Sequence, residues 1–186
     1  MFELLKTIWI FAIFFIANQA ISTSAKASNT ASKIWHGTVI HVTDGDTLRI
    51  RPLGSNSKSD SLRIRIDGID APESCQQYGV KSAAALKKLL ISKQVTVTSR
   101  RFDDYGRDVA KVAIDNVDVG SWMVKNGHAW SYHYRFSAGP YGQEEEAATR
   151  AKLGLFADAS AIEPKIFRRE HGSCYSQPKN DRKRYK

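Results

Sequence analysis

The sequence contains few of the residues that mark small cross-linked or metal-cluster proteins. Cysteine occurs only twice in 186 residues, at Cys75 and Cys174, which excludes a disulfide-dense scaffold and a cysteine-rich zinc site. The five histidines lack zinc-ligand spacing as well, and we expect structural or surface roles for them. No apolar run reaches the roughly 20 residues that a membrane-spanning helix needs, and no internal repeat is present. These absences leave one ordinary globular domain with short flanking segments.

The N-terminal segment has the pattern of a secretory signal peptide. Lys6 precedes the apolar run Ile8 to Ala17, and Ala25-Lys26-Ala27 supplies an A-x-A cleavage pattern. We therefore expect residues 1–27 to be a signal peptide, followed by a flexible lead-in over residues 28–33, and the mature protein to be periplasmic or secreted. The alternative is an uncleaved membrane anchor.

Positive charge is in surplus. The full chain has a formal net charge of +9, and removal of residues 1–27 would lower it by only one. Such a surplus in a small domain favours polyanionic partners, either nucleic acid or anionic lipid, although it also serves solubility. Basic residues recur after Pro164, and residues 169–186 are expected to be a basic C-terminal tail.

If the protein is exported, its two cysteines can form a disulfide. In an oxidising compartment, a Cys75–Cys174 disulfide would tie the C-terminal segment to the body of the domain. Two free thiols are the alternative, because the sequence does not give the separation of the two residues.

The middle of the chain reads as short strands interrupted by one helix. Strands are predicted over residues 34–43, 46–51, 61–69, 94–101 and 109–114, and helices over 76–91, 120–126 and 143–153. Asp44-Gly45 predicts a two-residue type I′ hairpin turn between the first two strands. Five strands with a helix between the third and fourth predict an α+β fold, a five-stranded OB-fold β-barrel with about three helices, over residues 34–168.

Acidic residues and arginines at the strand ends could carry chemistry. Asp70-Ala71-Pro72-Glu73 follows a strand, and alone it could be a helix-entry signal. Together with Asp46, Arg65 and Arg107, it offers what phosphodiester hydrolysis needs. Carboxylates can hold a divalent cation and activate water, and two guanidiniums can stabilise charge on a phosphate. Arg65 and Asp70 converge only if the strand kinks or ends near Gly68.

These motifs resemble those of the staphylococcal nuclease (thermonuclease) family from about Ile34 to Arg168. The similarity lies in six segments that occur in the same order: Asp44-Gly45-Asp46-Thr47, Arg65 to Glu73, Tyr78-Gly79, Asp104-Tyr105-Gly106-Arg107, Gly127-His128-Ala129-Trp130 and Gly154-Leu155-Phe156. The resemblance implies an OB-fold barrel with three helices and a calcium-dependent endonuclease activity on DNA and RNA.

The resemblance also implies a role for individual residues. Arg65, Glu73 and Arg107 correspond to the catalytic trio, with Glu73 as the general base or water-orienting group. Asp46 and Asp70 correspond to the calcium-binding carboxylates, and Ala71 to a residue that offers its backbone carbonyl. Tyr132 and Tyr134 resemble an aromatic pair that lines the nucleotide pocket. Phe156 replaces the more usual tryptophan, which we interpret as a change in the core.

The leading hypothesis is therefore an exported, calcium-dependent nuclease that acts as a monomer, with DNA and RNA as its substrates. A non-catalytic OB module that binds single strands by charge and stacking is the main alternative, and a binder of anionic lipid is a weaker one. The nuclease hypothesis predicts that Asp46, Arg65, Asp70, Glu73 and Arg107 meet at one cleft. A pure binding module gains nothing from carboxylates that face phosphate.

Overall fold

The computed structural model describes residues 32–172 and 174. The expected signal peptide, most of the lead-in and most of the basic tail lie outside these residues. No helix in the described part of the chain is long and apolar enough to cross a membrane. The strands are β1 (Lys33–Val42), β2 (Thr47–Pro52), β3 (Leu62–Ile66), β4 (Ile69–Asp70), β5 (Gln94–Phe102), β6 (Asp108–Ile114), β7 (Val117–Asp118) and β8 (Trp130–Ser131). The helices are α2 (Gly79–Leu90), α3 (Val119–Lys125), α4 (Gly142–Arg150) and α5 (Pro164–His171), with short 3₁₀ turns η1 (Lys58–Asp60) and η2 (Gly154–Ala157).

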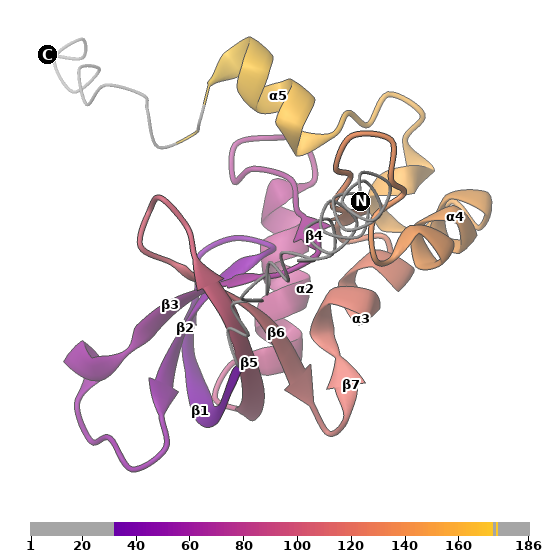
Figure 1. Ribbon diagram of the computed structural model, residues 1–186. Coiled ribbons are helices and arrows are strands. Elements are labelled where there is room, and N and C mark those ends of the chain that lie inside the picture. Colours follow the sequence, from indigo (N-terminus) through magenta and orange to yellow (C-terminus); the bar gives the residue numbers. More distant parts are fainter. Residues whose placement is uncertain (1–31, 173, 175–186) are drawn as a thin grey trace, which may run out of the picture. The chain divides into compact units, whose positions relative to one another are not determined.

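Five strands close into a barrel (Figure 1). β1 pairs antiparallel with β2 and β5, β2 pairs with β3, and β5 pairs with β6. A parallel pairing of β3 with β6, in which Ile64 faces Asp108, joins the two ends of the sheet. The predicted five-stranded OB-type barrel is confirmed, and closure removes the open edges that a flat sheet would expose.

The barrel core follows from alternation along the strands. In β2, Leu48 and Ile50 are fully buried while Arg49 is exposed, and Ile64 and Ile66 of β3 are buried in the same way. The helices α2 and α3 add to the same core, through Leu86 and Leu90 of α2 and Met123 and Val124 of α3. The helices thus cover the barrel with apolar side chains and leave charged ones in solvent.

A break after β3 redirects the chain towards the cleft. β3 ends at Ile66, Gly68 has φ of +83°, and β4 begins at Ile69. A side chain at Gly68 would clash with Pro140 and Tyr141 as well as strain the backbone. The predicted kink at Gly68 is confirmed, and it allows Asp70 to turn back towards Arg65.

The predicted type I′ turn at Asp44-Gly45 is wrong. Neither residue has positive φ, and the connection is a wider loop in which the Thr43 N–H donates to the Thr47 carbonyl at 2.8 Å. Gly45 is needed for a different reason: a Cβ there would lie 1.9 Å from Ser82 Oγ of α2. The close approach of α2 to this loop, rather than turn geometry, requires glycine.

Three of the four helices found within residues 32–172 lie where the sequence predicts helices. The fourth, α5, occupies residues that the sequence assigns to the end of the domain and the start of a basic extension. Pro164 occupies its first turn, where the missing N–H is not needed for intrahelical bonding. In Figure 1, α5 lies beside the loop that joins β4 to α2.

A disulfide fixes the chain just after α5. Cys75 and Cys174 are bonded with their Cα atoms 5.8 Å apart, inside the expected range. The bond links the β4–α2 loop to a residue 99 positions later, so the C-terminal segment is held at that loop.

Replacing both cysteines by serine is expected to cost about 4 kcal/mol of stability, because the closed loop is long. The midpoint of thermal unfolding should fall by roughly 10 °C, as measured by calorimetry against the parent protein. The parent protein, unfolded without reductant, should have no titratable thiol. An unchanged midpoint would mean that α5 detaches before the barrel unfolds.

Candidate active site

One cavity of about 730 Å³ opens at the end of the barrel that the β4–α2 loop borders. Separate parts of the chain line it: the β1–β2 loop, β3, the segment from Asp67 to Glu73, the β5–β6 turn, Tyr132 after β8, and α5. Its polar and charged lining includes Asp44, Asp46, Thr47, Arg63, Arg65, Asp67, Glu73, Arg101, Asp103, Asp104, Tyr105, Arg107, Tyr132 and Arg168. The predicted Arg65, Glu73 and Arg107 therefore share one cleft.

Arg65 joins the two predicted metal-binding carboxylates. Its Nη1 lies 2.5 Å from Asp46 Oδ1, and its Nη2 lies 3.0 Å from Asp70 Oδ1. Both carboxylates are buried, at 4% and 5% exposure. Asp46 also accepts hydrogen bonds at 3.0 Å from the Ala71 N–H and from Thr47 Oγ1. The guanidinium thus provides the positive charge that buried carboxylates require.

The acidic cluster extends to Asp44, which the sequence assigns only to a turn. Burial and the neighbouring negative Asp46 raise the pKa of Asp44 to about 7. Burial also works to raise the pKa of Asp46, but the charge of Arg65 and the hydrogen bond from Ala71 outweigh it and hold that pKa below its usual value. The half-buried Asp44 therefore adds a third carboxyl group beside Asp46 and Asp70, and its negative charge is disfavoured by the charge of Asp46.

Arg107 is held at the mouth of the cavity by its own turn. Its Nε donates to Asp103 Oδ2 at 2.7 Å, and its Nη1 donates to Thr47 Oγ1 at 3.3 Å. Asp103 in turn accepts the Arg107 backbone N–H at 2.9 Å, and the guanidinium stacks on the Tyr105 ring, 5.4 Å from its centroid. The β5–β6 turn therefore fixes the arginine before any substrate arrives.

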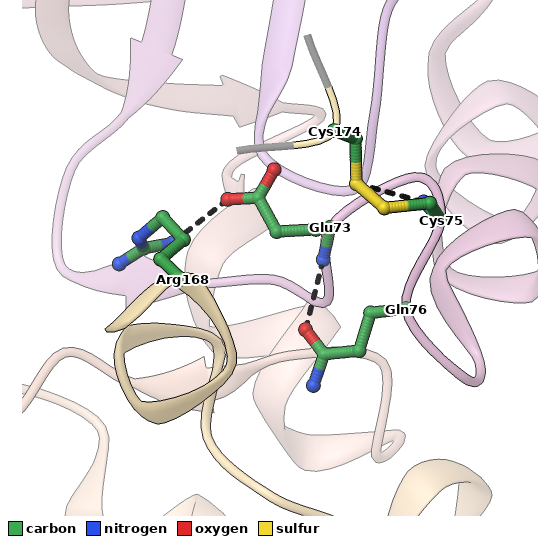
Figure 2. Close-up of a disulfide and its surroundings, with 5 residues drawn as sticks. All are labelled: Glu73, Cys75, Gln76, Arg168 and Cys174. Atoms are coloured by element: carbon green, nitrogen blue, oxygen red, sulfur yellow. Dashed lines mark hydrogen bonds and ion pairs between the residues drawn. A yellow bond between two sulfur atoms is a disulfide. The ribbon is translucent and has the colours of Figure 1, made fainter. Parts of the chain in front are cut away.

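Glu73 is held by contacts on both its backbone and its side chain (Figure 2). Its backbone N–H donates to Gln76 Oε1 at 3.1 Å, and its carboxylate accepts from Nη1 of Arg168 at 3.0 Å. Arg168 also donates to both oxygens of Asp70, at 3.2 and 3.0 Å. A single residue of α5 thus connects Glu73 with Asp70.

Of the two tyrosines predicted to line the nucleotide pocket, one lines the cavity and the other does not. Tyr132 lines the cavity, and its N–H donates to the Gly68 carbonyl at 2.8 Å. Tyr134 lies outside the cavity lining, is 62% exposed, and has the Arg135 guanidinium over its ring. Only Tyr132 is positioned to meet a ligand in the cavity as it stands.

Arg168 is the main site residue that sequence reasoning missed. It looked like one of several basic residues near a solvated tail. The signal that could have found it is Cys174, because a bond to Cys75, two residues after Glu73, brings the preceding segment to the cleft.

The donor set suits a hard divalent cation. Asp46, Asp70 and the backbone carbonyl of Ala71 are oxygen ligands of the kind such cations prefer. The same two carboxylates already share one positively charged group, Arg65. Within residues 32–172 and 174, no three His, Cys, Asp or Glu side chains form a metal cage, so a cation here would have two carboxylates and complete its shell with backbone or solvent oxygens.

Comparisons with known proteins agree with this geometry. The family model described as "Staphylococcal nuclease homologue" matches residues 63–158. A protein of Escherichia coli O157:H7 named "Uncharacterized endonuclease" is 37% identical over 134 residues, covering 72% of this chain and 84% of its own. A Haemophilus influenzae protein of the same name is 37% identical over 133 residues, covering 71% and 72%. The "Micrococcal nuclease" of Shigella flexneri is 33% identical over 147 residues, covering 73% and 81%.

The barrel, the cleft and these similarities define a hydrolytic nuclease. The chain belongs to the staphylococcal nuclease family.

Proposed function

We propose that the protein is an exported, calcium-dependent endonuclease that hydrolyses phosphodiester bonds in DNA or RNA. The observation that carries the proposal is that Arg65, Glu73 and Arg107, from three separate segments, line one cavity beside the buried Asp46. A surface that only bound nucleic acid would gain nothing from carboxylates facing phosphate, because like charges repel.

In this proposal Glu73 accepts a proton from the attacking water or orients it. The hydrogen bond from the Glu73 backbone N–H to Gln76 fixes the backbone that carries this side chain. Glu73 lines the cavity, which leaves space for a phosphate next to its carboxylate. Arg65 and Arg107 bind the phosphate and stabilise the charge that builds on its oxygens. Calcium held by Asp46, Asp70 and the Ala71 carbonyl would neutralise the scissile phosphate and help to position the nucleophile.

Substrate binding would draw on the rest of the lining. Arg63 and Arg101 add positive charge at the cavity wall, and Tyr105 and Tyr132 offer aromatic faces on which bases can stack. These contacts are sequence-tolerant, which suits a nuclease that accepts both DNA and RNA.

Digestion of single- and double-stranded DNA and RNA, with calcium, with magnesium and with chelator, tests the proposal directly. We expect internal cleavage with calcium and none with chelator. Binding of an oligonucleotide without cleavage under any metal condition would instead support the non-catalytic OB module.

Replacement of Asp46 by asparagine tests the metal role. Calcium affinity, measured by calorimetry, is expected to fall about tenfold or more, because one charged ligand is lost. Excess calcium should restore part of the activity. Asp115→Asn is the matched control, because Asp115 lies in the β6–β7 turn at φ of +48°, a conformation that asparagine tolerates. Equal affinity in the parent protein and Asp46→Asn would contradict the assignment.

A further inference from the structure

Helix α5 inserts a positive charge among the site's acidic groups. The Arg168 guanidinium makes three hydrogen bonds there: two to the two oxygens of Asp70, and one to Glu73. The side chain is 34% exposed, so it reaches the carboxylates from the solvent side of the cleft. Nη2 of Arg65 also donates a hydrogen bond to Asp70 Oδ1. Both oxygens of this carboxylate are therefore already paired with guanidinium groups.

Contacts hold α5 at both ends. Before the helix, Gln76 Nε2 donates to the Ile162 carbonyl at 2.8 Å, and His133 lies between Glu163 at 3.5 Å and Glu145 at 3.4 Å. After the helix, Cys174 is bonded to Cys75 in the same loop that carries Glu73 (Figure 2). The chain is thus fastened on each side of Arg168, which keeps the guanidinium at a high local concentration next to its partners.

The charge balance shows what this contact does to a cation. Asp46, Asp70 and Glu73 are three acidic side chains, and the positive charges of Arg65 and Arg168 neutralise two of them. A divalent ion on Asp70 must compete with these guanidinium groups for the same two carboxylate oxygens. The attacking water must likewise share Glu73 with Arg168.

We propose that α5 is a tethered latch whose Arg168 competes with the divalent cation for Asp70 and occupies one oxygen of Glu73, so that opening of the latch sets the affinity for metal. The inference rests on the function proposed above and adds a regulator to the same site. The regulator is part of the chain itself, and the Cys75–Cys174 bond keeps it closed.

The size of the effect follows from the closed fraction. Apparent affinity for a ligand falls in proportion to the fraction of molecules able to bind it. A latch closed in about 90 to 99% of molecules would weaken calcium binding roughly 10- to 100-fold. Removing the competing side chain should recover that factor.

The experiment is calorimetric titration of calcium, without nucleic acid, into the full chain and its variants. Arg168→Gln is expected to bind calcium at least about tenfold more tightly than the parent protein. Arg169→Gln is the matched control, because Arg169 is 74% exposed on the same helix and pairs only with Glu170 among the described residues. Its affinity should equal that of the parent.

A second variant protects the test against a folding defect. The double change Cys75→Ser and Cys174→Ser leaves Arg168 in place but releases its tether, and it should also tighten calcium binding, by a smaller factor. Far-ultraviolet circular dichroism reports whether each variant retains the fold. Equal or weaker calcium affinity in folded Arg168→Gln would overturn the latch, as would unchanged affinity in the folded double variant.

Cleavage assays on the parent protein show whether only the latch proposal fails or the proposed nuclease function fails as well. If the parent cuts DNA or RNA with calcium while folded Arg168→Gln binds calcium no more tightly, only the latch is wrong. If neither protein binds calcium or cuts, both proposals fail.

Discussion

Glu73→Gln is expected to lower kcat for cleavage of a short oligonucleotide by about 10²- to 10⁴-fold. Glutamine has nearly the shape of glutamate and leaves the backbone bond from residue 73 to Gln76 intact, so the cleft should keep its form. It cannot accept the proton of the attacking water, and this loss acts only on the chemical step. Calcium affinity should not fall, because Glu73 is not a proposed ligand of the ion and its loss of charge only weakens the pairing with Arg168.

Steady-state cleavage at several calcium concentrations measures this effect. Glu146→Gln is the control, because Glu146 lies on the exposed face of α4, where it pairs with Arg150. Cleavage by Glu73→Gln at the parent's rate would remove the general base from the mechanism.

Arg107→Lys is expected to lower kcat by roughly 10²- to 10³-fold, the usual cost of one preorganised donor. Lysine keeps the charge, yet it has neither the Nε that binds Asp103 nor the second nitrogen that reaches Thr47. The ammonium group would therefore move freely where the guanidinium is fixed. Affinity for uncut nucleic acid should fall far less than kcat, because attraction at long range depends on charge alone.

The same assay, together with oligonucleotide binding in the presence of chelator, distinguishes the two quantities. Arg100→Lys serves as the control, since Arg100 is an exposed neighbour on β5 that pairs with Asp67 and lies outside the cavity lining. Weaker binding with an unchanged kcat in Arg107→Lys would assign the arginine to ground-state binding.

Local patterns in the sequence predict the barrel well. Alternation of apolar and charged residues in β2 and β3 marks one buried face, and that face is the core. The kink at Gly68 is predictable too, because Arg65 and Asp70 can converge only if the strand bends between them, and Gly68 supplies a conformation that glycine adopts readily. Such features depend on neighbours a few positions away.

Errors in the prediction occur where distant segments decide the structure. Gly45 looks like a turn residue, but α2 packs against it and sets its conformation. Arg168 looks like part of a solvated basic stretch, although its partners Asp70 and Glu73 lie about a hundred positions earlier. A stretch of basic residues gives no local indication of which distant carboxylates it will contact. Only the pairing of Cys75 with Cys174 could have shown that the segment around Arg168 lies near Glu73.

The parallel pairing of β3 with β6 has a consequence for how activity arises as the chain folds. Asp46, Arg65 and Glu73 all precede β6, whereas Arg107 directly precedes its first residue. Docking of β6 against β3 is a non-local step, and such steps are slow to form. The pairing of β6 with β3, which closes the barrel, therefore also brings Arg107 to the site. A folding intermediate with an open barrel lacks the complete pair of guanidiniums, so catalytic competence should emerge together with the sealed barrel.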